Sequence, residues 1–148
     1  MIRLFRKVLC PVDFSEQSLA ALDVALKMVQ QNDAALYLLN VAPIPAGAAG
    51  FQPVPMEPYP IVEKDRHEQL EKLARKRVPA AVRCETLVIS GDPAEQVLET
   101  ARGLDADLIV MGTHGRRGLS HLVLGSVAER VVRESPIPVL TARSTARA

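Results

Sequence analysis

The chain has 148 residues, a length typical of one domain that buries its core without disulfides or metals, and we expect residues 1–148 to form one domain. Hydrophobic residues make up 48% and aromatic ones only 3%, which indicates a core of Val, Leu, Ile and Ala. The formal net charge of +1 and the scarcity of aromatic rings argue against nucleic-acid binding as the main role.

The amino-terminal residues have the charge of a signal peptide but not its apolar stretch. The run from Val8 to Val12 is too short, and no apolar run approaches the length of a membrane span, so we expect a cytoplasmic protein. Cys10 and Cys84 fall in predicted strands, where buried thiols behave as small hydrophobes. We expect no disulfide between them and no catalytic role for either.

The first elements form a strand, a helix and a second strand. A strand is predicted over residues 7–13, with Pro11 near its carboxyl end, where ladder pairing can lapse. Ser15 is the predicted N-cap of a helix with one apolar face, and residues 35–41 form the next buried strand. The apolar face of the helix consists of Leu19, Leu22, Leu26 and Val29. This is a βαβ unit, whose crossover is right-handed.

Prolines and glycines dominate residues 42–60. The prolines are Pro43, Pro45, Pro53, Pro55, Pro58 and Pro60, and their density argues against a helix or a paired strand. We interpret the segment as a mobile surface connection or, alternatively, as a lid over a ligand at that edge of the sheet.

Two helix–strand repeats follow. A charged helix is predicted over residues 61–78 and a strand over 82–89, whose early alternation of polar and apolar residues indicates an edge position. Asp92 as N-cap, Pro93 at the first helical position and Glu95 at the third predict a capping box at the start of the next helix. Its buried stripe comprises Val97, Leu98, Ala101 and Leu104.

The last part of the chain holds a strand over residues 108–111, a helix and a final strand. The helix is predicted from about Ser120 to Glu134, and the final strand over residues 136–142. The inward residues of the helix are Leu122, Val123, Val127 and Val131. The tail, residues 144–148, is too polar to pack.

These elements predict an α/β fold: a five-stranded, parallel, doubly wound, Rossmann-like sheet with the strand order 3-2-1-4-5. In this order the winding direction reverses between strands one and four, which places Asp13 beside Gly112. Ligands of doubly wound sheets bind at that reversal.

Glycines punctuate the segment between the fourth strand and the last helix. Gly112, Gly115, Gly125 and Ser126 give the spacing G-x2-G-x9-G-S, which matches neither the Rossmann fingerprint nor Walker A. Backbone N–H groups of these glycines and of residues 125–127 are candidate phosphate donors, and the Ser126 hydroxyl adds another. An ordinary tight loop is the alternative. We place Gly125 within the helical pattern, where glycine costs about 1 kcal/mol relative to alanine, and infer a close approach to its backbone.

This spacing resembles the universal stress protein family, in the ATP-binding branch that carries G-x2-G-x9-G-[S/T]. The opening strand, which ends in Pro-Val-Asp-Phe-Ser, and the closing Ser-Pro-Ile-Pro-Val-Leu extend the resemblance over nearly the whole chain. It implies an adenine nucleotide α hydrolase-like fold and an ATP site. In that site the glycines and Ser126 line phosphate and ribose, Val12 and Asp13 border the adenosine, and Val41 flanks the adenine. The candidate nucleotide-binding residues are Pro11, Val12, Asp13, Val41, Met111, Gly112, Gly115, Arg116, Gly125, Ser126 and Val127.

Several of these side chains have a second interpretation. Asp13 is suited to bind ribose hydroxyls or a divalent metal such as the Mg²⁺ of ATP, or it caps the following turn. Arg116 and Arg117 are suitable phosphate partners, or they are solvated. His114 and His121 lack partners at zinc-ligand spacing. Ala128 stands where ATP-binding relatives often carry Ser or Thr, so one phosphate hydroxyl is missing.

The function that we expect is that of an ATP-binding stress-response protein whose nucleotide state alters its assembly or its partners. Pairing of the apolar last strand, Val139–Ala142, with that of a second copy predicts a homodimer, as the resemblance implies. The alternatives are a slow ATPase or nucleotide hydrolase with Asp13 or His114 as the base, and a stress protein that binds no nucleotide and acts through protein partners. A receiver domain is disfavoured because Ser90 occupies the place of its phosphoacceptor, and an FMN site because no glycine follows the first strand.

Overall fold

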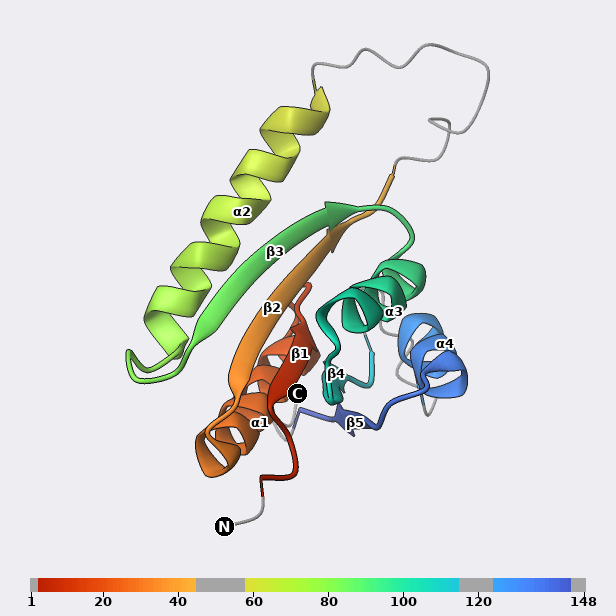
Figure 1. The fold of residues 1–148 in the computed structure, drawn as a ribbon. Coiled ribbons are helices and arrows are strands. Elements are labelled where there is room, and N and C mark those ends of the chain that lie inside the picture. The colour runs from red at the N-terminus through yellow and green to blue at the C-terminus, as the bar shows by residue number, and fades with distance from the viewer. Residues whose placement is uncertain (1–2, 45–57, 115–123, 145–148) are drawn as a thin grey trace.

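Strands and helices alternate in the computed structural model (Figure 1), which describes residues 3–44, 58–114 and 124–144. The elements are β1 (Lys7–Pro11), α1 (Glu16–Asn32), β2 (Ala35–Ala42), α2 (Pro58–Arg77), β3 (Cys84–Ser90), α3 (Pro93–Leu104), β4 (Leu108–Gly112), α4 (Ser126–Glu134) and β5 (Val139–Ala142).

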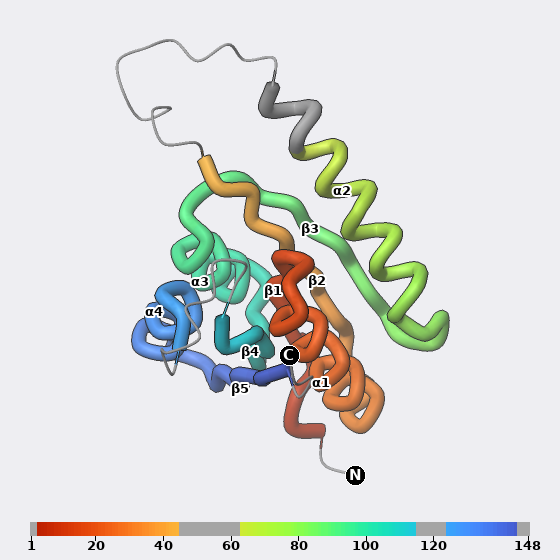
Figure 2. The backbone as a smooth tube through the Cα atoms, turned by 180° about the vertical axis from the view of Figure 1, so that it is seen from behind, coloured from red at the N-terminus to blue at the C-terminus, as the bar shows by residue number. Residues whose placement is uncertain are grey.

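The five strands form one parallel sheet in the order β3-β2-β1-β4-β5, which confirms the predicted topology. Helices α1 and α2 cover one face, and α3 and α4 cover the other (Figures 1 and 2). The edge position predicted for β3 is also confirmed. Because all strands run in one direction, their carboxyl ends meet at a single edge of the sheet.

Two apolar layers hold the helices to the sheet. The layer beneath α1 and α2 includes Leu22, Leu36 and Leu70, and the layer beneath α3 and α4 includes Leu39, Ile109 and Val131, all fully buried. Burial of a side chain of this size contributes about 1.5–3 kcal/mol. The central strands β1, β2 and β4 supply residues to both layers, so their carboxyl ends are rigidly placed.

The helix caps largely agree with those predicted from the sequence. The Ser15 side chain accepts a hydrogen bond from the Ser18 N–H, and the Asp92 side chain accepts one from the Glu95 N–H, so both predicted N-caps are confirmed. Helices α1 and α3 end at Asp33 and Asp105, which adopt the left-handed conformation at φ 51° and 52°. Aspartate adopts the left-handed backbone conformation more readily than most other residues.

Three predicted starting residues are wrong, for reasons that involve proline or a turn. Helix α2 begins at Pro58, not at residue 61, because proline is tolerated in a first turn, whose N–H groups need no intrahelical acceptor. Strand β3 begins at Cys84 rather than at residue 82, since the Val82 N–H closes a turn onto the Pro79 carbonyl. Strand β5 begins at Val139 because Pro138 has no N–H to donate to a ladder.

The start of the last helix also differs from the prediction. Helix α4 begins at Ser126, and Gly125 is its N-cap in an extended conformation, with φ −68° and ψ 164°. Gly125 therefore does not lie inside a helix, and the helical penalty assigned to it from sequence does not apply. The predicted helical residues 120–123, with Leu122 and Val123, lie outside the described residues.

Both cysteines are free, as predicted. Burial raises the pKa of the Cys84 thiol to about 11, with a smaller contribution from the Glu85 carboxylate, and burial raises the pKa of the Cys10 thiol further still. Thiols with raised pKa values are poor nucleophiles at neutral pH. No helix among the described residues is long and apolar enough to cross a bilayer.

We expect the free energy of unfolding to decrease as the pH rises from about 8.5 towards 11. In this range the unfolded chain loses thiol protons that the folded chain retains, so the unfolded state gains stability. Urea denaturation at a series of alkaline pH values measures the slope, and Cys10→Ala should be less stable at neutral pH but less sensitive to alkali. An equal slope in wild type and Cys10→Ala contradicts this assignment.

Candidate functional site

The carboxyl ends of β1 and β4 separate at the point where the winding of the sheet reverses. Their paired register ends at Leu9 and Ile109, although both strands continue. The Val12 N–H points to β2, where it donates to the Leu39 carbonyl at 2.8 Å. The backbone N–H groups of successive residues point to opposite sides of a strand, so the backbone of residue 11 faces β4. Pro11 has no N–H to donate to that strand. The proline therefore ends the β1–β4 ladder at the switch point, where ligands of doubly wound sheets bind.

The turn after β1 is held in an unusual conformation. Phe14 has φ 66°, which is uncommon for a bulky side chain and is one of three such non-glycine residues among those described. One carboxylate oxygen of Asp13 accepts the Ser15 N–H at 3.0 Å, and the Asp13 N–H donates to the Ser18 hydroxyl. Asp13 therefore caps the following turn, as one of its two interpretations predicted, and it is half-buried just beyond the end of β1.

The end of β4 packs directly on the first turn of α1. A Cβ atom at Gly112 would lie 2.8 Å from the backbone carbon of Gln17 and 2.9 Å from its carbonyl oxygen, so only glycine fits there. The Gln17 side-chain oxygen accepts the Thr113 hydroxyl at 3.3 Å and the Ser144 N–H at 2.8 Å. His114 Nδ1 lies 3.1 Å from the same hydroxyl. This cluster fixes the chain as it leaves β4 and β5.

The first turn of helix α4 lies at this edge, and the described residues provide no side-chain cap for it. Gly125 at the N-cap supplies no acceptor, and its own N–H donates to the Thr113 carbonyl at 2.7 Å. A Cβ at Gly125 would lie 3.3 Å from both the Thr113 oxygen and the His114 Cα, so the close neighbour inferred from sequence is the chain itself. The N–H groups of Ser126 and Val127 begin a helix whose partial positive charge favours an anion.

The remaining predicted site residues differ in how deeply they are buried. The Met111 side chain is buried in the layer beneath α3 and α4, which leaves only its backbone for a ligand. Val41 is half-buried near the end of β2, and Ser126 is exposed. Ala128 is buried in the same layer as Met111, so a hydroxyl in its place would face the core. Gly115, Arg116, Arg117 and His121 lie outside the described residues.

Sequence reasoning missed four polar residues at this edge. They are Gln17, Asn40, Arg66 and Thr113, and each forms a hydrogen bond that joins two elements. Thr113 and Asn40 are buried. Asn40 could have been noticed in the sequence because it is polar and lies in an otherwise apolar strand.

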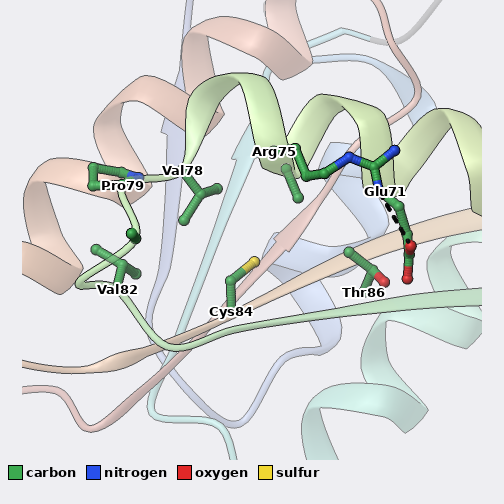
Figure 3. A pocket seen from close by; sticks show the side chains of 9 residues that line it. Glu71, Arg75, Val78, Pro79, Val82, Cys84 and Thr86 are labelled. Carbon is green, nitrogen blue, oxygen red and sulfur yellow. Dashed lines mark ion pairs between the residues drawn. The ribbon is translucent and has the colours of Figure 1, made fainter.

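One groove formed by the described residues lies away from this edge. It has a volume of about 330 Å³ and is bounded by the carboxyl end of α2 and the amino end of β3 (Figure 3). Cys84 and Thr86 point from β3 towards α2, where Arg75 and Glu71 form an ion pair. The groove is at the opposite end of β3 from the switch point. In doubly wound sheets ligands bind at the switch point, so this groove is not the candidate site.

The strand order and the reversal of winding between β1 and β4 define a doubly wound, Rossmann-like α/β protein. A family model described as "Universal stress protein family" matches residues 4–143, and the chain belongs to this family.

One curated relative agrees with the family, and two solved structures agree with the fold. Universal stress protein MJ0531 of Methanocaldococcus jannaschii is 35% identical over 144 residues, which cover 95% of this chain and 83% of the relative. The structure of universal stress protein UspA from Lactobacillus plantarum has a TM-score of 0.76 at 24% identity, with 97% of this chain and 100% of that one covered. A universal stress protein crystallised in complex with cAMP has a TM-score of 0.69 at 27% identity, with 96% and 99% covered.

Proposed function

We propose that this chain binds an adenine nucleotide, ATP, at the carboxyl edge of the sheet and acts as a nucleotide-dependent regulatory protein of the stress response. The observation that carries the proposal is the first turn of α4, which has no side-chain cap among the described residues and lies beside the end of β4, where the β1–β4 ladder has stopped. A helix amino terminus without a side-chain cap is suited to phosphate oxygens. The relative in complex with cAMP supports an adenine nucleotide as the ligand.

Each proposed contact uses a different chemical property of the edge. The N–H groups of Ser126 and Val127 and the Ser126 hydroxyl donate to phosphate oxygens. Asp13 accepts from ribose hydroxyls or holds the Mg²⁺ that accompanies ATP, since carboxylate oxygens suit both roles. Pro11, Val12 and Val41 border the adenosine, and the backbone of Met111 and Gly112 borders the ribose. From the sequence motif we assign phosphate contacts to Gly115 and Arg116 as well.

Identification of any co-purifying ligand tests the proposal. The protein is purified without added nucleotide and denatured, and the released small molecules are identified by chromatography and mass spectrometry, with a Gly115→Val/Gly125→Val double variant in parallel. We expect ATP or ADP from the wild type alone, or uptake of ATP by the wild type in calorimetric titration. A folded wild type that contains no nucleotide and takes up none refutes the nucleotide site and favours a stress protein that acts through protein partners.

We also propose a homodimer formed through β5, Val139–Ala142, which is an edge strand of the sheet. An unpaired, apolar edge strand can pair with its copy across a two-fold axis. Val139→Lys places a charge in that interface and should shift the sedimentation coefficient to that of a monomer, while Glu85→Lys, on the opposite edge strand β3, should not. A Val139→Lys protein that remains a dimer excludes this interface.

A further inference from the structure

Asn40 is a polar residue buried in the carboxyl half of β2. Only 1% of its surface is exposed, and its neighbours Leu38 and Leu39 are fully buried. A buried amide without hydrogen bonds is strongly unfavourable, so the partners of Asn40 reveal why it is tolerated. They lie on two other elements of the protein.

The Asn40 amide bridges the end of β1 and helix α2. Its Nδ2 donates to the Val12 carbonyl at 2.6 Å, and its Oδ1 accepts from Arg66 Nη1 at 2.9 Å. Arg66 can only donate and a carbonyl can only accept, so the orientation of the amide is chemically fixed. The guanidinium charge polarises the amide and strengthens its second bond, in agreement with the short distance. No ion pair among the described residues involves Arg66.

The hydrogen bond to Val12 interrupts the pairing of β1 with β2. The register runs from Lys7 and Ala35 to Pro11 and Leu39, and the Val12 N–H completes it by donating to the Leu39 carbonyl. In a parallel ladder the next bond would run from the Val41 N–H to the Val12 carbonyl. That bond is absent from the described part of the chain, and the Asn40 side chain occupies the carbonyl instead. The Val41 N–H consequently has no backbone acceptor among the described residues outside the strand ladders.

We propose that Asn40, held by Arg66, is a positioning residue that ends the β1–β2 ladder and keeps the Val41 N–H available to the base of a bound nucleotide. The inference rests on the proposed function and extends it to base selection. A backbone N–H needs an acceptor on the base. Adenine presents an unprotonated ring nitrogen on its pairing edge, whereas the corresponding nitrogen of guanine carries a hydrogen. The arrangement therefore selects adenine over guanine.

The test uses Asn40→Leu, Arg66→Met and, as a matched control on the same helix, Arg75→Met. Hydrogen exchange of the Val41 amide is followed by NMR in the nucleotide-free protein. Affinities for ATP, GTP and inorganic tripolyphosphate are measured by calorimetry. Tripolyphosphate has no base and reports on the phosphate site alone.

In Asn40→Leu the freed Val12 carbonyl should accept the Val41 N–H, so we expect exchange of that amide to slow. ATP affinity should fall about tenfold, the factor that corresponds to one hydrogen bond, and the preference for ATP over GTP should fall with it. Affinity for tripolyphosphate should be retained. Arg66→Met should change exchange and base preference in the same direction but less, and Arg75→Met should change neither.

Two results overturn the inference: an unchanged exchange rate of the Val41 amide, or an equal loss of ATP, GTP and tripolyphosphate affinity, which would indicate general damage. If Asn40→Leu does not fold, Arg66→Met decides by the same two measurements, because Arg66 is only partly buried. A wild type that binds neither ATP nor GTP refutes the proposed function and base selection together. In that case the exchange rate of Val41 still decides whether Asn40 ends the ladder.

Discussion

Replacement of Gly112 by valine is expected to destabilise the protein by about 3 kcal/mol or more, a value at the upper end for overpacking. Even the first added carbon would lie 2.8 Å from the Gln17 backbone carbon and 2.9 Å from its carbonyl oxygen. These atoms belong to the first turn of α1, which cannot rotate away as a flexible side chain can. The strand and the helix must therefore separate, and the layer beneath α1 opens.

Urea denaturation of Gly112→Val and Gly112→Ala against wild type measures this effect, and alanine should show most of it because the clash begins at Cβ. Gly103→Ala is the matched control. Nothing lies within 4 Å of a Cβ at Gly103, in helix α3, so this substitution should stabilise by about 0.5–1 kcal/mol. A Gly112→Ala protein as stable as wild type would show that α1 is free to shift.

This prediction affects how the glycine motif is interpreted. Gly112 is required for packing between β4 and α1 whether or not a ligand binds. Loss of nucleotide from a Gly112 variant would follow from a damaged fold and would say nothing about contact with phosphate. Gly125 is more informative, because its extended backbone is open to any residue and its contacts are looser.

Local sequence determined much of the fold. Apolar runs separated by amphipathic segments predicted the parallel sheet and its order, and the polar alternation at residues 82–89 placed β3 at an edge. Ser15 and Asp92 marked their helix starts because an N-cap is a local interaction between a side chain and the next turn. Pro11 marked the end of the ladder at the switch point for an equally local reason.

Features that depend on distant residues were not predictable in this way. The start of α4 depends on a hydrogen bond between Gly125 and Thr113, and Gly112 is needed because of Gln17, far away in sequence. The bridge from Arg66 through Asn40 to Val12 joins three elements. A polar residue in an apolar strand indicates that some partner exists, but only the packed structure identifies it.

The uncapped start of α4 yields a prediction with opposite effects on stability and on binding. We expect Gly125→Asp to be more stable than Gly125→Ala by about 1 kcal/mol, because the carboxylate can accept the orphan N–H groups of the first turn. The comparison with alanine cancels the tight Cβ contact at 3.3 Å, which both variants share. Gly125→Ser should lie between them, since it caps without a charge.

The same substitution should weaken ATP binding about a hundredfold or more, because the carboxylate occupies the phosphate donors and repels the phosphates. Calorimetric titration of ATP into the two variants measures the loss, and urea denaturation measures the gain in stability. ATP affinity equal in Gly125→Asp and Gly125→Ala would exclude the start of α4 as the phosphate site. If both effects occur, glycine at this N-cap makes the helix less stable than a capped one, and it leaves the N–H groups of the first turn available to the ligand.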